Sequence, residues 1–418
     1  MKVLVLGGGG REHALCWALG RDHQVWCAPG NAGIAEIARC IDVDPTDTAA
    51  VREVALRAPV DLVVVGPEAP LVAGVADTLQ AADIPVFGPT AEAARIEGSK
   101  AFAKDVMTAA GVATAGYWAG TDPEHARAAL EDFAPPYVVK ADGLAAGKGV
   151  RICADHAEAE QAITDLMVEQ TLGAAGSMVV IEEFLDGPEV SVFGLCDGSD
   201  VVLLPPAQDF KRARDGNEGP NTGGMGAYSP YPIDDADFEK LRGSVFEPVM
   251  AELGSRGMRY VGVLYAGLIL TRDGPKVLEF NARFGDPETQ VVVPRLGGDL
   301  GRLLLACATG RLAQVDPPTV EDHACVAVVL ASGGYPGAYQ TGAPISGLDS
   351  AGNSEGRVVV FHAGTRRVDG DIVTAGGRVL AVTGCGATVA DACATAYAAA
   401  DRISFQGLHR RSDIAAGV

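Results

Sequence analysis

The 418-residue sequence has few aromatic residues and too little positive charge to balance its acids. Phe, Trp and Tyr make up 6% of the chain, and 33 Lys and Arg residues face 54 Asp and Glu residues, which gives a formal net charge of −21. A broad nucleic-acid or anionic-membrane surface needs clustered positive charge, so the composition argues against both. Phosphate ligands remain open, because a few basic residues, helix N-termini and a divalent ion can hold them inside a cleft.

Other absences exclude further classes of protein. The nine cysteines include no C-x-x-C pair, so neither a zinc site nor a disulfide framework is indicated, and reduced thiols of a cytoplasmic protein are expected. No apolar run approaches the length of a membrane span, and the chain opens on an apolar strand without a signal-like leader. No G-x-S-x-G motif accompanies the histidines, of which only His13 is expected to touch a ligand.

The apolar patterning predicts an α/β protein with three regions. Residues 1–98 alternate strands with helical segments, which favours a parallel sheet whose turns after the strands line one ligand-binding edge. Residues 99–322 contain further strands, a helix at 100–111 and a long loop at 208–230. Residues 323–418 have strands at 325–331, 357–362 and 378–383 and an Ala-rich helix, as expected for a small α+β domain.

The first glycine-rich turn, G-G-G-G-R-E, partly matches a dinucleotide-binding fingerprint. Gly7 and Gly9 fit its first two positions, but Glu12 stands where the third glycine belongs. A glycine turn that opens a helix offers free N–H groups to an anion, and Arg11 adds a cation. The alternative is a tight turn whose arginine faces solvent; we favour an anion site.

A second glycine-rich loop, at 142–149, follows the strand YVVK. Its glycine spacing is too short for a Walker A motif, and Gly149 replaces the Ser or Thr that would hold magnesium. Lys140 and Lys148 supply cations to a loop that could close over a triphosphate and exclude water. A flexible hairpin with solvated lysines fits this segment equally well.

Two further segments carry polar residues in unusual density. On a strand ending near 281, Glu279, Asn281 and Arg283 share a face if the strand runs that far, which suits a hard cation carrying phosphates; a surface strand with an ordinary salt bridge fits as well. The loop at 208–230 is rich in glycine, whose backbone N–H groups can bind anions or carboxylates. A loop of this length is usually functional or disordered, and its glycines favour function.

Taken together, these segments resemble the phosphoribosylamine–glycine ligase (glycinamide ribonucleotide synthetase) family of the ATP-grasp superfamily. The resemblance runs in order through KVLVLGGGGREHAL, APGNAG, VVKADGLAAGKGV, IEEFLDG, GPNTGGMGAYSP, EFNARFGDPETQ and GGRVL. It implies an ATP-grasp fold with a Rossmann-like N-terminal domain at 1–98, an ATP-grasp domain at 99–322 and a C-terminal domain at 323–418. The flap subdomain is expected at about 115–186.

The resemblance also implies a reaction, in which ATP, glycine and 5-phosphoribosylamine give glycinamide ribonucleotide, ADP and phosphate through a glycyl phosphate. This is an early amide-forming step of purine synthesis. The implied cofactor is Mg²⁺ or Mn²⁺, with ATP as co-substrate. The implied partners are these small molecules alone. The protein itself is expected to be a monomer or weak homodimer.

The family's functional positions carry over in four groups. The implied catalytic residues are Lys140, Arg283 and Asp286, and the implied metal ligands are Glu279 and Asn281. The implied ATP contacts are Lys104, Lys140, Gly143, Gly147, Lys148, Gly149, Glu182, Phe184 and Glu189, with the backbone of Glu182 and Phe184 at the adenine edge. The implied substrate pocket comprises Gly9, Gly10, Arg11, Asn31, Glu68, Asp209, Lys211, Thr222, Gly223, Arg283 and Asp286.

The sequence departs from the family in two places. Phe210 stands where the family often has His, and the strand at 263–270 lacks the carboxylate that many ATP-grasp enzymes use as a metal ligand. The rival interpretations are another ATP-grasp carboxylate–amine ligase, a nicotinamide-dependent dehydrogenase and a non-catalytic nucleotide sensor. The incomplete glycine fingerprint argues against the dehydrogenase, and intact Lys140, Glu279 and Asn281 argue against the sensor.

Overall fold

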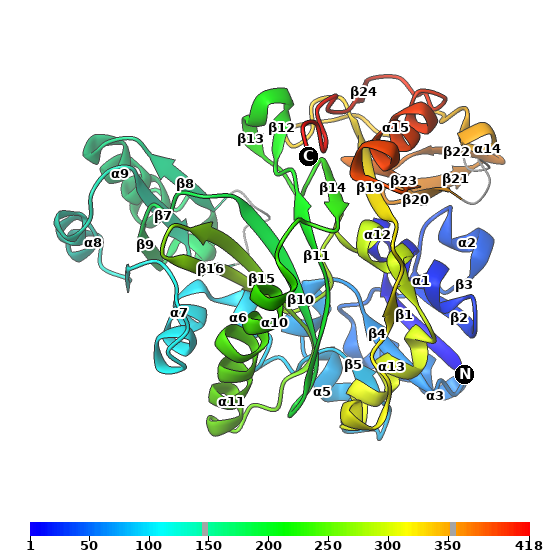
Figure 1. Cartoon of the computed structure of the whole chain (residues 1–418), viewed down its shortest axis with the longest axis horizontal. Coiled ribbons are helices and arrows are strands. Elements are labelled where there is room, and N and C mark those ends of the chain that lie inside the picture. Colours follow the sequence, from blue (N-terminus) through cyan, green and yellow to red (C-terminus); the bar gives the residue numbers. More distant parts are fainter. Residues whose placement is uncertain (144–148, 352–356) are drawn as a thin grey trace.

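The N-terminal region is built on a parallel sheet, as predicted. The computed structural model describes residues 1–143, 149–351 and 357–418, and Figure 1 shows this sheet in blue at the N-terminal end. Its strand order is β3-β2-β1-β4-β5, from β1 (Lys2–Gly7), β2 (Gln24–Pro29), β3 (Arg39–Cys40), β4 (Leu62–Val65) and β5 (Val86–Phe87). The chain leaves β1 in one direction and returns to β4 on its other side, so their carboxyl ends flank a topological switch point.

Short helices cover this sheet and link it to the next region. They are α1 (Gly10–Leu19), α2 (Ile34–Ile37), α3 (Thr48–Arg57), α4 (Glu68–Val72), α5 (Val75–Gln80), α6 (Arg95–Gly98) and α7 (Lys100–Ala109). The two-residue strand β3 was not predicted from the sequence, because so short a segment has no detectable period.

A four-stranded antiparallel sheet forms a separate lobe, at the left of Figure 1. Its order is β6 (Tyr117–Gly120), β9 (Val179–Glu183), β7 (Tyr137–Ala141) and β8 (Val150–Cys153), covered by α8 (Pro123–Ala129) and α9 (His156–Ile163). The lobe has its own buried cluster, which includes Leu130, Val139 and Ile163. We call this lobe the flap.

The largest sheet runs through the middle of the molecule into the C-terminal region (Figure 1). Its order is β16 (Gly274–Asn281), β15 (Val261–Thr271), β10 (Glu189–Asp197), β11 (Val201–Asp209), β14 (Gly226–Ser229), β19 (Ala324–Ser332), β23 (Arg378–Gly386) and β20 (Val358–His362), with β24 (Leu408–His409) beside β19. The packing helices are α10 (Asp235–Leu241), α11 (Glu247–Ser255), α12 (Thr289–Val292), α13 (Leu300–Ala308), α14 (Leu348–Ala351) and α15 (Val389–Ala400). Among the described residues, no helix has the length and apolarity needed to cross a bilayer.

The predicted loop at 208–230 is wrong as a single loop. Its ends belong to β11 and β14, which pair at Gln208–Tyr228 and Asp209–Ala227, and its middle forms a hairpin of β12 (Arg212–Arg214) and β13 (Glu218–Asn221). The sequence concealed these strands because their many glycines and prolines break the period-two alternation. Two other short antiparallel pairs are β17 (Leu296–Gly297) with β18 (Thr319–Val320), and β21 (Thr365–Val368) with β22 (Asp371–Thr374).

Alternation along β10 and β15 gives the sheet one apolar face and one face that also carries polar side chains. Val190, Val192, Leu264 and Ala266 point into the core shared with α11. On the opposite face, Phe193, Leu195 and Val263 pack into a second buried core, and Ser191 and Tyr265 add the polar groups for which we call it the polar face. This polar face carries the candidate site.

Close backbone packing of α15 on β23 generates a stability prediction. A Cβ atom on Gly384 would lie 2.6 Å from the carbonyl oxygen of Ala392, so Gly384→Ala is expected to lower the free energy of unfolding by about 1–3 kcal/mol through overpacking. The matched control is Gly254→Ala in α11, where a Cβ meets no atom within 4 Å. That change should be neutral or stabilising by up to about 1 kcal/mol. Denaturant unfolding of both variants measures these changes, and equal unfolding midpoints for the two variants would contradict the packing argument.

Candidate active site

Glu279 and Asn281 lie side by side at the end of β16. They pair with Gly267 and Tyr265 of β15, after a bulge in register at Leu278, and so occupy the polar face. Among the described residues, neither side chain makes a hydrogen bond or ion pair. Burial tends to raise the pKa of Glu279, but nearby lysines outweigh burial and hold this pKa below its ordinary value. The pair therefore offers ionised and neutral oxygens, a donor set that fits a hard divalent cation.

A buried carboxylate bridges two lysines beside this pair. The Glu182 oxygens lie 3.1 Å from Lys104 Nζ and 2.8 Å from Lys140 Nζ, and all three residues are buried. Burial lowers the pKa of Lys104 to about 8, and Glu182 opposes the shift. Two cations share one anion, so the cluster keeps a net positive charge suited to phosphate. Sequence reasoning considered only the backbone of Glu182 and missed this side-chain role.

The glycine-rich loop after β7 is anchored at the start of α7. Asp142 Oδ1 accepts hydrogen bonds from the Ser99 hydroxyl (3.1 Å) and the Ala101 N–H (2.7 Å). Lys100, also missed from the sequence, lies 3.4 Å from the Gly143 carbonyl oxygen, to which its ammonium donates. At the far end of the loop, the Gly149 carbonyl accepts from the N–H of Ala141 (2.8 Å). The predicted contacts Gly147 and Lys148 lie outside the described residues.

Lys211 lies close to two acidic side chains at the end of β11. Its ammonium lies 2.7 Å from a Glu189 oxygen and 3.9 Å from an Asp209 oxygen. Burial raises the pKa of Asp209 to about 7, although Lys211 opposes the shift. Thr222 donates to the Lys211 carbonyl (2.8 Å) and so fastens the neighbouring glycine turn. Phe184, a predicted ATP contact, lies just beyond the end of β9 and is 40% exposed.

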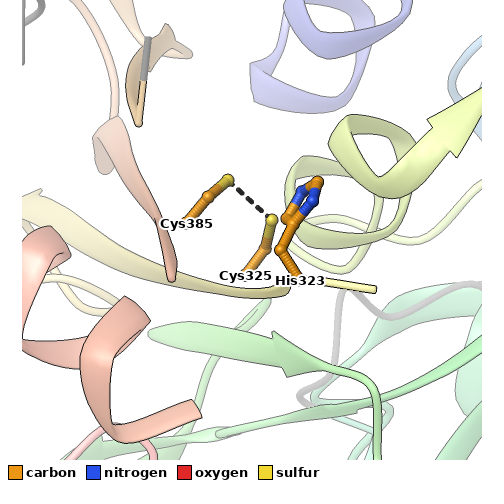
Figure 2. Close-up of side chains that lie close together, drawn as sticks. All are labelled: His323, Cys325 and Cys385. Atoms are coloured by element: carbon orange, nitrogen blue, oxygen red, sulfur yellow. Dashed lines mark hydrogen bonds between the residues drawn. The ribbon is translucent and has the colours of Figure 1, made fainter. Parts of the chain in front are cut away.

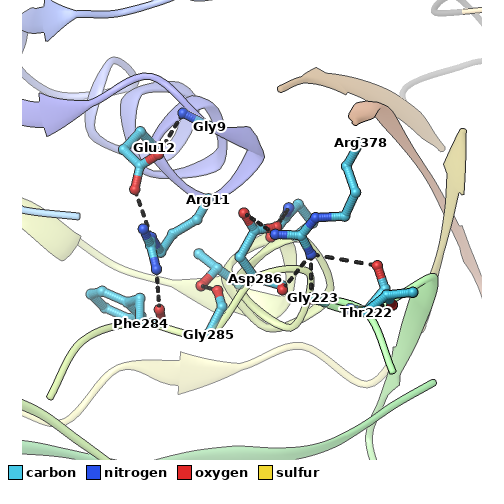
Figure 3. Close-up of polar contacts among 12 residues, drawn as sticks. Gly9, Arg11, Glu12, Thr222, Gly223, Phe284, Gly285, Asp286 and Arg378 are labelled. Atoms are coloured by element: carbon cyan, nitrogen blue, oxygen red, sulfur yellow. Dashed lines mark hydrogen bonds and ion pairs between the residues drawn. The ribbon is translucent and has the colours of Figure 1, made fainter. Parts of the chain in front are cut away.

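At the opposite side, the first glycine turn meets the turn that follows β16 (Figure 3). Arg11 Nε donates to Glu12 (2.6 Å), and its Nη1 donates to the Phe284 carbonyl (3.0 Å). Glu12 also accepts from the Gly9 N–H (2.6 Å), and a Cβ on Gly7 would lie 2.6 Å from Glu12 Cγ. The Glu12 side chain thus fills the space above the glycine turn, which argues against a dinucleotide at this position.

Arg378 holds two loops of the site together, and no sequence argument gave it a role. Its guanidinium lies 3.0 Å from Asp286 Oδ2, donates to the Asp286 carbonyl (2.7 Å) and also donates to the Gly223 carbonyl (Figure 3). Gln290 donates to the other Asp286 oxygen (2.7 Å). Burial tends to raise the pKa of Asp286, but Arg378 and then Arg11 lower it overall. The only sequence signal for Arg378 was its place in the segment GGRVL.

Arg283 does not continue the face of Glu279, because β16 ends at Asn281. Its guanidinium instead lies 3.0 Å from Glu97 and 3.6 Å from Glu68, and Glu97 was missed from the sequence. Arg283 Nε, the atom that lies 3.6 Å from the Glu68 carboxylate, is buried and makes no hydrogen bond among the described residues. An unsatisfied buried donor of this kind marks a position where a ligand acceptor would be stabilised.

Two predicted contacts serve the protein's own framework. Asn31 donates to the carbonyls of Gly8 (2.9 Å) and His362 (2.7 Å) and accepts two backbone N–H groups, so its amide braces the turn after β2. His13, for which a ligand contact was expected, also has a structural role, and the ligand contact stays a prediction. Its ring is buried and accepts the His362 N–H (2.8 Å), and burial lowers its pKa to about 3, which keeps it neutral.

Phe210 likewise belongs to the C-terminal packing. Its ring lies under the Arg411 guanidinium, 5.1 Å from centroid to carbon, and 6.3 Å from the Tyr228 ring. The place where the family often has His is therefore apolar and aromatic in this chain.

A flap that brings Lys140 against the end of β16 in a second antiparallel sheet is the arrangement of an ATP-grasp fold. The same overall fold occurs in the biotin carboxylase domain of Hydrogenobacter thermophilus 2-oxoglutarate carboxylase, with a TM-score of 0.76 at 18% identity, covering 98% of this chain and 91% of that one. Within that fold class, models of the phosphoribosylglycinamide synthetase N domain, ATP-grasp (A) domain and C domain match residues 1–97, 98–289 and 325–417. The chain belongs to the phosphoribosylglycinamide synthetase family.

Individual relatives agree with this assignment over the full length. The chain is 56% identical to the phosphoribosylamine–glycine ligase of Streptomyces coelicolor, covering 100% of this chain and 99% of that relative. It is 50% identical to the enzyme of the same name from Phenylobacterium zucineum, covering 99% and 98%. The crystal structure of the Thermotoga maritima phosphoribosylamine–glycine ligase superposes with a TM-score of 0.87 at 36% identity, covering 99% and 100%.

The lysine cluster generates a prediction about protonation. Glu182→Gln removes the anion that opposes the burial of Lys104, so the pKa of Lys104 should fall further below about 8, by about 1. A pH titration of the lysine Cε resonance by NMR measures this. Glu183→Gln is the matched control, since Glu183 pairs with Lys276 instead (3.1 Å) and should change the Lys104 pKa far less. Equal shifts in both variants would show that the bridge does not set this pKa.

Proposed function

We propose that this chain ligates glycine to 5-phosphoribosylamine at the expense of ATP, giving glycinamide ribonucleotide, ADP and phosphate. Membership of the family over the whole length supports this reaction. The observation that carries it is the free Glu279–Asn281 pair facing a positively charged lysine cluster, because such a pair suits a metal–nucleotide complex and little else.

ATP is proposed to lie between the flap and the polar face. Lys104, Lys140 and the loop at 143–149 would hold its phosphates, while the backbone of Glu182 and Phe184 would meet adenine and Glu189 would meet ribose. Mg²⁺ or Mn²⁺ would be held by Glu279 and Asn281, where it neutralises charge on the phosphate oxygens. Since Glu189 is already paired with Lys211, ribose hydroxyls would enter that ion pair as additional partners.

The second half of the site suits the amine and glycine. The turns with Gly9, Gly10, Arg11, Asn31 and Glu68 would take the phosphorylated ribose, because a helix start and the Arg11 cation favour an anion, even though Glu12 already accepts the Gly9 N–H. Glycine would lie among the remaining predicted pocket residues, Asp209, Lys211, Thr222, Gly223, Arg283 and Asp286. The unsatisfied Arg283 Nε supports a carboxylate or phosphoryl oxygen at this position.

The chemistry proposed for this site has two steps. The glycine carboxylate attacks the γ-phosphorus of ATP, which forms glycyl phosphate and releases ADP. The amine nitrogen then attacks the acyl carbon, phosphate leaves, and the amine proton is lost to phosphate or water. Lys140 and Arg283 offset the developing charge, Asp286 fixes the turn beneath them, and closure of the flap would keep water from the acyl phosphate.

The direct test is ADP release from purified protein with ATP, magnesium and glycine, with and without phosphoribosylamine formed in place from ribose 5-phosphate and ammonia. Release that requires both substrates, with one amide per ADP, is expected. ADP release with glycine alone would point to a different amine, and no release under any combination would favour a nucleotide sensor.

The finer expectations of a cytoplasmic monomer or weak homodimer, with domain limits near 98 and 322, stay predictions.

Glu279→Gln tests the metal assignment. Loss of one ligand charge should reduce turnover by about 100-fold while the unfolding midpoint stays near that of the unaltered protein. The matched control is Glu183→Gln, a carboxylate on the flap that makes an ion pair outside the proposed metal site. A near-normal rate at limiting magnesium would overturn the assignment.

Arg11→Ala tests the phosphate end of the substrate site. The KM for phosphoribosylamine should rise about tenfold or more, and the KM for ATP should stay unchanged, because Arg11 lies on the N-terminal turn rather than beside the lysine cluster. Steady-state kinetics with each substrate varied in turn measures this. Equal effects on both constants would show that Arg11 only supports the fold.

A further inference from the structure

Two cysteines from distant parts of the chain meet on neighbouring strands in the C-terminal part of the central sheet. Cys325 of β19 and Cys385 of β23 are direct partners in an antiparallel pair, and their sulfur atoms lie 2.8 Å apart (Figure 2). The His323 ring is beside them, and one of its nitrogens and both sulfurs lie within 4.8 Å of one another. We call these three residues the thiol cluster.

The surroundings of the thiol cluster make its two sulfurs unequal. Cys325 is buried, whereas Cys385 is half-buried. The hydrogen bond from Cys325 lowers the pKa of Cys385, burial opposes this, and the nearby Arg295 guanidinium lowers the pKa further. Burial raises the pKa of the Cys325 thiol well above its ordinary value. The more accessible sulfur is therefore also the better nucleophile.

Hydrogen bonds hold Arg295 in place beside His323. Arg295 Nε donates to the His323 carbonyl (2.7 Å), and its Nη1 donates to the Ser229 hydroxyl (3.0 Å). Burial, and then Arg295, lower the pKa of His323, so its imidazole is neutral near pH 7 and able to accept a thiol proton. A cation that favours the thiolate and a neutral base beside it are the features of a reactive thiol.

A bound metal ion is the competing use of the same three residues. Tetrahedral zinc with bonds of about 2.3 Å to sulfur would hold two thiolates about 3.8 Å apart, well beyond their separation in this structure. The Arg295 charge also opposes a second cation. Direct cross-strand partners, in contrast, have Cα separations within the range that a disulfide spans.

We propose that Cys325 and Cys385 form a reversible disulfide by exchange with a small-molecule disulfide. The Cys385 thiolate attacks one sulfur of that disulfide, its S–S bond breaks, and one thiolate leaves. The Cys325 sulfur, after losing its proton to His323 or water, attacks Cys385 and expels the second thiolate. The protein loses two hydrogens and two electrons, and the small disulfide is reduced to two thiols.

The test uses the reduced full-length protein and oxidised glutathione. Intact mass should fall by two hydrogens without a lasting adduct, peptide mapping should link residues 325 and 385, and dithiothreitol should reverse both changes. Cys325→Ala should accumulate a glutathione adduct on Cys385, whereas Cys385→Ser should react at least tenfold more slowly at this site. Cys393→Ser, a half-buried thiol elsewhere in the C-terminal region, is the matched control and should behave as the unaltered protein.

Three results would overturn the proposal, and none depends on ligase activity. The first is a lasting glutathione adduct on the unaltered protein without a 325–385 link. The second is that Cys325 in the Cys385→Ser variant reacts with oxidised glutathione as fast as the two thiols react in the unaltered protein. The third is one zinc ion per purified chain that is lost in both variants and protects the thiols from oxidation, because the residues would then be metal ligands.

Discussion

The site depends on keeping opposite charges close together on the partly buried polar face of one sheet. Removing an ion from water is costly unless a partner replaces the lost hydration, and here each charge has such a partner. Glu182 sits between Lys104 and Lys140, Arg283 contacts Glu97, and Arg378 contacts Asp286. Glu279 is the exception, since it is surrounded by cations and has no ion pair of its own within the described parts of the chain. The network is therefore complete except where a metal–nucleotide complex would enter.

The apolar face of the same sheet makes this arrangement possible. Val192, Leu264 and Phe280 are almost fully buried against α11 and neighbouring helices, so the strands stay in register while their other face is polar. Because the side-chain period of a strand is two, a slip of one residue would exchange the faces. The hydrophobic core thus fixes the positions of Ser191 and Glu279, which do not belong to it, and of Tyr265, whose ring does.

The C-terminal region completes the site. Its strands β19 and β23 extend the central sheet, and Arg378 at the start of β23 reaches both the Gly223 carbonyl and Asp286. The thiol cluster lies at the opposite end of β23, at Cys385. One strand therefore carries a residue that holds the substrate loops and, seven residues later, the proposed redox site.

The fold class, the parallel N-terminal sheet and most polar segments could be predicted from the sequence, because alternation, glycine turns and motifs that resemble one family are visible without knowledge of tertiary contacts. The sequence also placed Glu279 and Asn281 on one face, since that depends only on strand period. Tertiary structure alone decided the roles of Glu12, Glu97, Glu182 and Arg378, the hairpin inside the predicted loop, and the meeting of Cys325 with Cys385. Most of those outcomes depend on contacts between residues far apart in the chain, up to 186 positions for Glu97 and Arg283, and no local pattern encodes which distant partner a side chain will meet.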